Sequence, residues 1–151
     1  MAVSGRVVWI GLRPARRRAP VVVSEAQVLA GRGLVGDRAE ARPSRVRQVT
    51  LIDAAAISAG ALQLGLATID PALLRRNLVV EGVDFAAARG QRLRLGEVLL
   101  AISGPCDPCA RMDEALGEGA FEALRDRGGL TATVLEGGIV RIGSPVAIER
   151  L

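Results

Sequence analysis

Short apolar runs, each bounded by glycine, proline or charged residues, follow one another along the chain. Strand-like runs rich in valine, isoleucine and leucine occupy residues 6–10, 20–29, 46–52, 77–81, 92–95, 98–102, 130–135, 139–142 and 146–148. Such runs, β-branched and partly alternating, are typical of β-strands. The pattern predicts a mainly β domain whose core contains Val49, Leu51, Leu78, Val80, Leu99, Ile102, Val134, Val140 and Ile142.

Helical spacing is confined to a few short segments. Asp53 is a suitable N-cap for a helix over residues 54–64, and Asp70, followed by proline, predicts another over 72–76. A further short helix is predicted over 120–125. Because strands and helices do not alternate regularly, we expect a β-rich α+β fold, a barrel-like domain with short helices on its loops.

The length of 151 residues suits a single domain over residues 1–151 that buries a core without disulfides or a structural metal. No apolar run reaches 18 residues and no signal-peptide pattern is present, so we expect no membrane span. Two closely spaced cysteines are not the framework of a secreted disulfide protein. We therefore expect a cytoplasmic protein.

Missing residue types exclude several chemistries. The chain has no histidine, which excludes Ser–His triads and His-ligated zinc within it. All 20 basic residues are arginine. Without lysine, the Schiff base of a pyridoxal phosphate enzyme cannot form, so that cofactor is excluded.

The net charge of +4 could indicate nucleic acid, but Trp9, Phe85 and Phe121 are the only aromatic residues. Three rings are too few for a base-stacking surface, so we expect no nucleic-acid partner. The arginine fork suits phosphate and carboxylate groups, which makes a small anionic ligand the expected partner. The run Arg16–Arg18 is expected to be an exposed loop that is not part of the binding site.

Both cysteines lie in one segment, residues 104–112. Asp107 is a suitable N-cap and Pro108 a suitable first helical residue, which would put Cys109 in the first turn of a helix. That position favours a thiolate, and Arg111 adds positive charge. The alternatives are a buried structural pair, a Cys-x-x-Cys redox centre, or half of a zinc site.

The ordered motifs resemble the MOSC family, domains similar to the C-terminal part of molybdenum-cofactor sulfurases. They are Gly-Leu-x-Gly-Asp-Arg, Val-Thr-Leu-Ile, Arg-x-Asn, Gly-Pro-Cys-x-Pro-Cys-x-Arg-Met, Arg-Gly-Gly-Leu and Val-Leu-Glu-Gly-Gly. The resemblance runs from about residue 21 to 148 and is greatest to small stand-alone bacterial members. It implies a β-barrel-like fold.

The resemblance also implies a site built on a molybdenum–pterin cofactor (molybdopterin). Cys109 matches the cysteine whose sulfur ligates molybdenum in the active members, where it is catalytic. The matched motifs assign cofactor binding to Asp37, Arg38, Arg75, Asn77, Arg111 and Arg127. Together with Cys109, the residues Arg38, Arg75, Asn77 and Arg127 are expected to meet in one cleft.

Two functions follow from this resemblance. One is reduction of N-hydroxylated substrates, with electrons from a separate reductase. The other is a non-catalytic cofactor binder or sulfur (persulfide) carrier that delivers to molybdoenzymes. The chain departs from small relatives at Ala39, where histidine is common, and at Ser144, where aspartate often follows glycine. The first departure removes a polar group that could lie near metal or substrate.

Overall fold

The computed structural model describes residues 5–106, 112–125, 127 and 129–151 of the chain. Its strands are β1 (Gly5–Leu12), β2 (Val21–Val23), β3 (Glu25–Leu29), β4 (Gly33–Leu34), β5 (Val49–Asp53), β6 (Leu78–Glu81), β7 (Arg92–Leu95), β8 (Val98–Pro105), β9 (Leu130–Glu136), β10 (Gly138–Arg141) and β11 (Pro145–Glu149). Its helices are α1 (Arg38–Ala41), α2 (Ala54–Leu64), the 3-10 helix η1 (Pro71–Leu74), α3 (Phe85–Ala88), α4 (Met112–Leu116) and α5 (Ala120–Leu124). Among these helices, none has the length and apolar character needed to cross a membrane.

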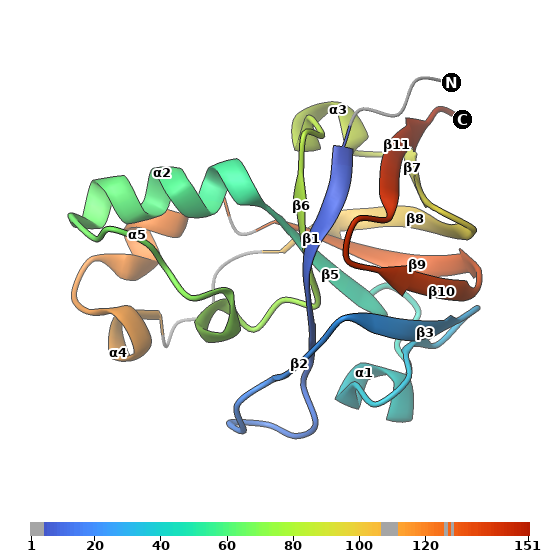
Figure 1. Ribbon diagram of the computed structural model, residues 1–151, viewed down its shortest axis with the longest axis horizontal. Coiled ribbons are helices and arrows are strands. Elements are labelled where there is room, and N and C mark those ends of the chain that lie inside the picture. The colour runs from blue at the N-terminus through green and yellow to red at the C-terminus, as the bar shows by residue number, and fades with distance from the viewer. Residues whose placement is uncertain (1–4, 107–111, 126, 128) are drawn as a thin grey trace.

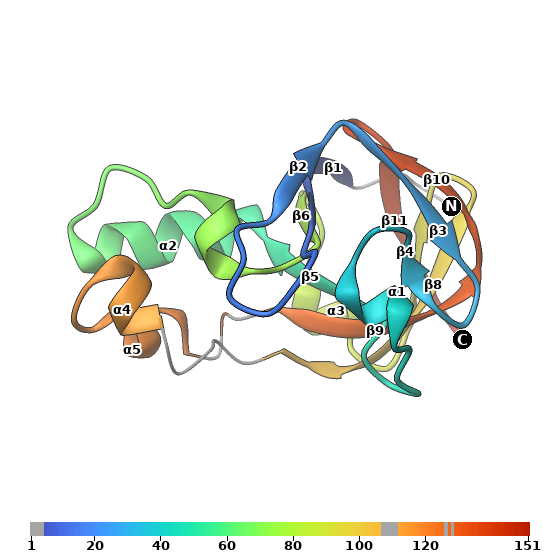
Figure 2. The same ribbon diagram turned by 90° about the horizontal axis from the view of Figure 1, so that it is seen from below.

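In the described part of the chain, seven strands close into a mixed β-barrel, with a helical lobe of α2, α4 and α5 at one side (Figures 1 and 2). The strand order is β11-β7-β8-β9-β5-β6-β1, and β1 pairs back with β11. Closure removes the free edges that an open sheet would expose. The predicted β-rich α+β fold with short helices is confirmed.

One pair of barrel strands, β5 and β6, is parallel. Parallel neighbours need a crossover, and here α2 and η1 provide it. Asp53 ends β5 and caps α2 by accepting a hydrogen bond from the backbone N–H of Ala55 at 3.0 Å. The sequence analysis did not predict this β–α–β unit, because a single unit gives no repeating alternation.

The predicted strand over residues 20–29 is divided at Ser24. The first part, β2, pairs with β1 of the barrel, and the second part, β3, lies between β10 and β4 in a separate sheet. Val21 and Val22 are exposed in β2, whereas Ala26 and Val28 are buried in β3. The two halves therefore lie in different environments. The continuous valine-rich sequence does not indicate where the strand is divided.

Two apolar clusters support the fold, one inside the barrel and one beneath the helical lobe. They separate on β5 because successive side chains point to opposite faces: Leu51 points into the barrel and Ile52 towards α2. Seven of the predicted core residues are buried, and Ile102 packs partly buried against the barrel core. The prediction for Ile142 is wrong: it is 47% exposed, because β10 ends at Arg141 and Ile142 begins a turn.

Candidate functional site

The Gly-Asp-Arg motif presents a buried carboxylate at the start of α1. Oδ1 of Asp37 accepts hydrogen bonds from the backbone N–H and Nε of Arg13, at 2.7 and 3.1 Å. Oδ2 accepts from Nη2 of Arg13 and from the backbone N–H of Ala39, both at 3.0 Å. The side chain of Asp37 is fully buried, so this bidentate pair joins the loop after β1 to α1.

The pKa of Asp37 lies below its ordinary value. Burial by itself acts to raise this pKa, since it disfavours the charged form. The hydrogen bonds and the positive charge of Arg13 outweigh that effect, with a further contribution from the N–H of Ala39. Asp37 is therefore ionised and its charge is balanced by Arg13.

Asn77 completes this buried network. Its Nδ2 donates to Oδ1 of Asp37 at 2.9 Å and to the carbonyl oxygen of Gly11 at 3.1 Å. Its Oδ1 accepts from the backbone N–H of Thr50 at 3.1 Å. The side chain, fully buried, thus links β1, β5 and the Asp37 loop. These contacts stabilise the fold, and cofactor binding by Asp37 and Asn77 stays a prediction.

Arg75 fastens the loop between β1 and β2 against η1. Its backbone has φ +57, a left-handed conformation uncommon outside glycine. From there Nη1 donates to the carbonyl oxygen of Arg18 at 2.5 Å, and Nη2 to that of Ala15 at 3.1 Å. Nη1 of Arg13 donates in turn to the carbonyl oxygen of Arg75 at 3.4 Å. The loop is therefore held at both of its ends.

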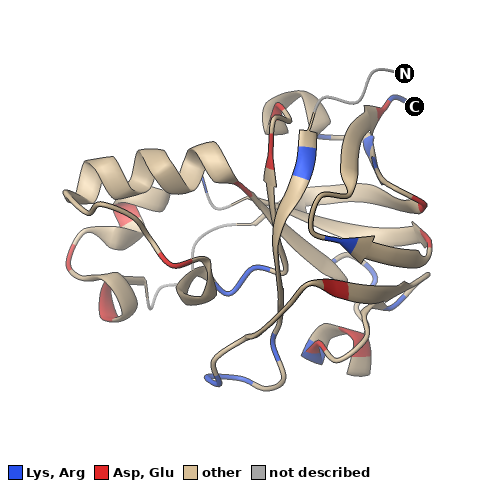
Figure 3. Cartoon of the chain, viewed as in Figure 1, with Lys and Arg blue, Asp and Glu red and all other residues tan. Residues whose placement is uncertain are grey.

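A pocket of about 560 Å³ opens beside this loop, and we call it the first pocket. Five arginines line it, together with Glu114 and apolar residues that include Leu73 and Met112; the arginines are Arg16, Arg17, Arg18, Arg38 and Arg75. Figure 3 shows the positive charge on the β1–β2 loop and near α1. The structure thus brings together two predicted residues, Arg38 and Arg75.

The prediction that Arg16–Arg18 lie outside a cleft that contains Arg38 and Arg75 is wrong. The run is an exposed loop, as expected, but its side chains line the first pocket. The hydrogen bonds from Arg75 to the carbonyl oxygens of Ala15, directly before the run, and of Arg18, at its end, explain this position. Charge runs are usually solvated, and the sequence gives no sign that a residue 57 positions away holds this one.

Most arginines of the first pocket have no partner within the described chain. No hydrogen bond or ion pair joins the side chains of Arg16, Arg17, Arg18 or Arg38 to a described residue. Of the residues that line the pocket, four arginines therefore have no ion pair with a described residue, and Glu114 is the single acidic residue beside them. Such a lining favours an anion that accepts several hydrogen bonds at once.

Arg127 lies elsewhere. Its Nη1 donates to Oε1 of Gln63 at 3.2 Å and to the carbonyl oxygen of Ala123 at 3.0 Å. It lines a separate pocket of about 240 Å³ with Asp53 and Arg89. The expected convergence with Arg38 and Arg75 is therefore wrong for Arg127, whose side chain is hydrogen-bonded to Gln63 of α2.

The central cysteine segment lies outside the described residues. This applies to Cys109 and Arg111 and to the predicted cap at Asp107 and Pro108, so their roles stay predictions. The two described ends of the segment are Cys106, which is 5% exposed, and Met112, which lines the first pocket. The cysteine segment therefore joins the first pocket at Met112.

Arg76 is a residue that the sequence analysis missed. It is only 7% exposed, and its Nη1 donates to the carbonyl oxygen of Leu74 at 3.2 Å. Its Nη2 donates to the carbonyl oxygen of Cys106 at 3.5 Å, which brings a buried positive charge to the start of the cysteine segment. The available signal was its position between Arg75 and Asn77, directly before a buried strand.

Gly129, in the Arg-Gly-Gly-Leu motif, holds the other side of Cys106. Its carbonyl oxygen accepts a hydrogen bond from the backbone N–H of Cys106 at 2.9 Å. Its φ is +107, and a Cβ atom here would overlap the carbonyl oxygen of Leu51. Glycine is therefore required by backbone conformation and by close approach to β5.

The sequence matches the MOSC domain over residues 16–147. The chain belongs to the MOSC domain family. Its fold is similar to that of the YuaD protein from Bacillus subtilis, with a TM-score of 0.83 and 19% identity over 97% of this chain and 96% of that one. It is also similar to YiiM from Escherichia coli, with a TM-score of 0.69 and 20% identity over 97% of this chain and 70% of that one.

YiiM from Geobacillus stearothermophilus is a third similar structure, with a TM-score of 0.70 and 13% identity over 96% of this chain and 75% of that one. At these identities the likeness extends to the fold alone. No sequence match was found among curated proteins. The resemblance to small bacterial MOSC proteins is confirmed by the family match and by these structures.

Proposed function

We propose that this MOSC protein binds a molybdenum–pterin cofactor in its first pocket and reduces N-hydroxylated substrates with electrons from a separate reductase. The observation that carries the proposal is the arginine lining of that pocket, which meets the cysteine segment at Met112. Membership of the MOSC family supports this class of cofactor.

The residues of the first pocket fit such a cofactor. Arg16, Arg17, Arg18 and Arg38 have guanidinium groups available for its phosphate, and guanidinium forks bind phosphate by paired hydrogen bonds. Leu73 and the other apolar residues provide a surface for a flat ring. Arg75, held against the loop carbonyls, keeps the three loop arginines at the pocket.

Cys109 is the proposed ligand of the metal. A soft thiolate suits molybdenum, and one protein sulfur is sufficient because the cofactor brings two of its own. When bound, the cofactor supplies a redox-active metal beside the substrate. Arg111 and the buried Arg76 add positive charge, which favours the thiolate form of a nearby cysteine.

The proposed reaction converts R–NH–OH to R–NH₂ and water. The N–O bond breaks, an N–H bond forms, and two electrons and two protons are consumed. The chain has two cysteines and no histidine, too few for the four cysteine or histidine ligands of an iron–sulfur cluster. A partner with a flavin or iron–sulfur centre is therefore the electron donor in this proposal.

The alternative is a cofactor binder or persulfide carrier that delivers to molybdoenzymes. Ala39 favours it, because a methyl group stands where small relatives commonly have histidine. Without histidine the chain lacks the side chain best suited to proton transfer near neutral pH. In this alternative Cys109 holds sulfur or cofactor and no turnover occurs.

Molybdenum and pterin content tests the proposal. The parent and two variants, Cys109→Ser and Cys106→Ser, are purified from a host that makes the cofactor. We expect Cys109→Ser to lose molybdenum, because a hydroxyl group cannot replace a soft thiolate on the metal. Cys106→Ser, the matched control, should retain most of it. Full molybdenum occupancy in Cys109→Ser would contradict the assignment of the metal ligand.

A second assay separates the two functions. The loaded parent is mixed with a flavin reductase and an N-hydroxylated purine, and the amine product is measured. Turnover that disappears in Cys109→Ser supports the enzyme. A persulfide on Cys109, detected by mass spectrometry in a protein without turnover, supports the carrier.

A further inference from the structure

A second pocket, of about 670 Å³, adjoins the first pocket. Two residues, Arg16 and Arg38, line both pockets. Arg13, Arg42, Arg47 and Thr50 also line the second pocket, and no acidic residue does among those of the described chain. Because the two pockets share Arg16 and Arg38, they are neighbours on the surface.

The arginines of the second pocket differ in their charge balance. Arg13 is paired with the buried Asp37 and contributes little free charge. The side chains of Arg16, Arg38, Arg42 and Arg47 have no hydrogen bond or ion pair with any described residue. Arg38 and Arg42 also stand four residues apart, where like charges repel.

Arg47 is presented on a well-anchored loop. The backbone N–H of Arg47 donates to Oγ of Ser44 at 3.1 Å. Nε2 of the buried Gln48 donates to the carbonyl oxygen of Ser44 at 2.8 Å, and its Oε1 accepts from the backbone N–H of Val134 on β9 at 2.8 Å. The fold thus positions this charge beside three others, and a bound anion would remove their repulsion.

We propose that the second pocket is a phosphate-binding site for a group distinct from the one held in the first pocket. The group is a phosphate ester, because four guanidinium groups without a partner among the described residues suit a dianion with several acceptor oxygens. It belongs either to a phosphorylated substrate or to a nucleotide attached to the cofactor. The site stands on the arginines alone, whereas the choice between these two sources rests on the proposed function.

Calorimetric titration of the cofactor-free protein with inorganic pyrophosphate tests the site. We expect Arg47→Gln to weaken binding at one of two sites by about tenfold. Arg45→Gln is the matched control, since Arg45 is exposed in the same loop and lines neither pocket. Arg38→Gln should weaken pyrophosphate binding in both pockets, whereas Arg17→Gln should weaken it only in the first pocket. Equal affinities in Arg47→Gln and Arg45→Gln would overturn the proposal.

The source of the phosphate is resolved on protein purified from a cofactor-making host. An extracted pterin whose mass includes a nucleotide identifies the cofactor extension, and then pyrophosphate should no longer bind at the Arg47 site. A pterin without a nucleotide, with that site still open to pyrophosphate, identifies a separate phosphorylated substrate. A protein that carries no pterin would contradict the proposed function and leave the pyrophosphate result intact.

Discussion

Arg13 and Arg38 both lie beside Asp37, and their side chains behave differently. Arg13 forms two side-chain hydrogen bonds with the fully buried Asp37, and Asn77, the residue before β6, donates to the same carboxylate. Arg38 follows Asp37 directly in the sequence, yet its side chain is exposed and meets no described partner. Arg13 joins the loop after β1 to α1, whereas Arg38 lines both pockets without a described partner.

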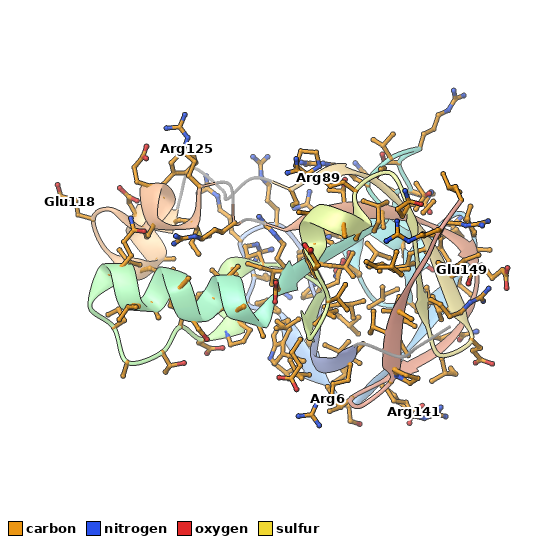
Figure 4. All side chains as sticks on the ribbon, turned by 90° about the horizontal axis from the view of Figure 1, so that it is seen from above. Arg6, Arg89, Glu118, Arg125, Arg141 and Glu149 are labelled. Atoms are coloured by element: carbon orange, nitrogen blue, oxygen red, sulfur yellow. The ribbon has the colours of Figure 1, made fainter. Side chains whose placement is uncertain are left out.

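This difference shows that residue type alone does not determine whether an arginine stabilises the fold or is available to a ligand. A guanidinium paired with a buried carboxylate contributes to stability, because removal of either partner leaves an uncompensated charge. A guanidinium without a partner contributes little to stability and is available to a ligand. Surface arginines outside the pockets form a third class: Figure 4 shows Arg6, Arg125 and Arg141 pointing away from the body of the molecule.

The largest expected effect is on stability at Asp37. We expect Asp37→Ala to lower the free energy of unfolding by about 3–5 kcal/mol, because Arg13 would lose its buried partner. Arg38→Ala, at the next residue, should change it by less than about 0.5 kcal/mol. Urea unfolding of both variants measures the contrast. A loss below about 1 kcal/mol for Asp37→Ala would mean that the pair does not stabilise the fold.

The pKa values of two aspartates should be shifted in opposite directions from the ordinary carboxyl value. The pKa of Asp37 is lowered by Arg13 against the effect of burial, whereas that of Asp53 is raised by burial and by the negative charge of Asp84. The stability from Asp37 is therefore present above the ordinary carboxyl pKa of about 3.9 and lost as the pH falls below it. Carboxyl carbon shifts followed by NMR against pH give both values. The same sign for both shifts would refute the contrast.

The smallest effect is expected at Asp53. Since its pKa is raised, its contribution is most favourable at low pH and is lost as the pH rises through that pKa. Asparagine caps a helix about as well as aspartate and carries no charge. Asp53→Asn should therefore raise the free energy of unfolding at pH 7 by about 0.5 kcal/mol or less. A loss above about 1 kcal/mol would show that the charge itself is needed.

The sequence predicted the fold better than the site, for physical reasons. Val49, Leu78 and Val134 follow from local periodicity, which is set by the geometry of each strand. The exposure of Ile142 depends on where β10 ends, a tertiary property. The motifs pointed to Arg38 and Arg75, which do share a pocket.

The sequence could not predict which polar residues face a pocket and which face inward. Asn77 and Arg76 are neighbours of Arg75 in one motif, yet both are buried while Arg75 lines the first pocket. The direction of each side chain depends on distant partners: Asp37 for Asn77, and the Cys106 carbonyl for Arg76. Long-range pairing of this kind leaves no local pattern.

We propose that Arg16, Arg17 and Arg18, whose side chains have no partner among the described residues, hold the cofactor, and the proposed function depends most on this claim. Its most direct test is the pterin and molybdenum content of the triple variant Arg16→Gln, Arg17→Gln, Arg18→Gln, purified beside the parent from a cofactor-making host. We expect the triple variant to lose cofactor by at least about tenfold, because three charge-assisted contacts to phosphate are removed. Its free energy of unfolding should be unchanged. Cofactor content equal to that of the parent would contradict the claim.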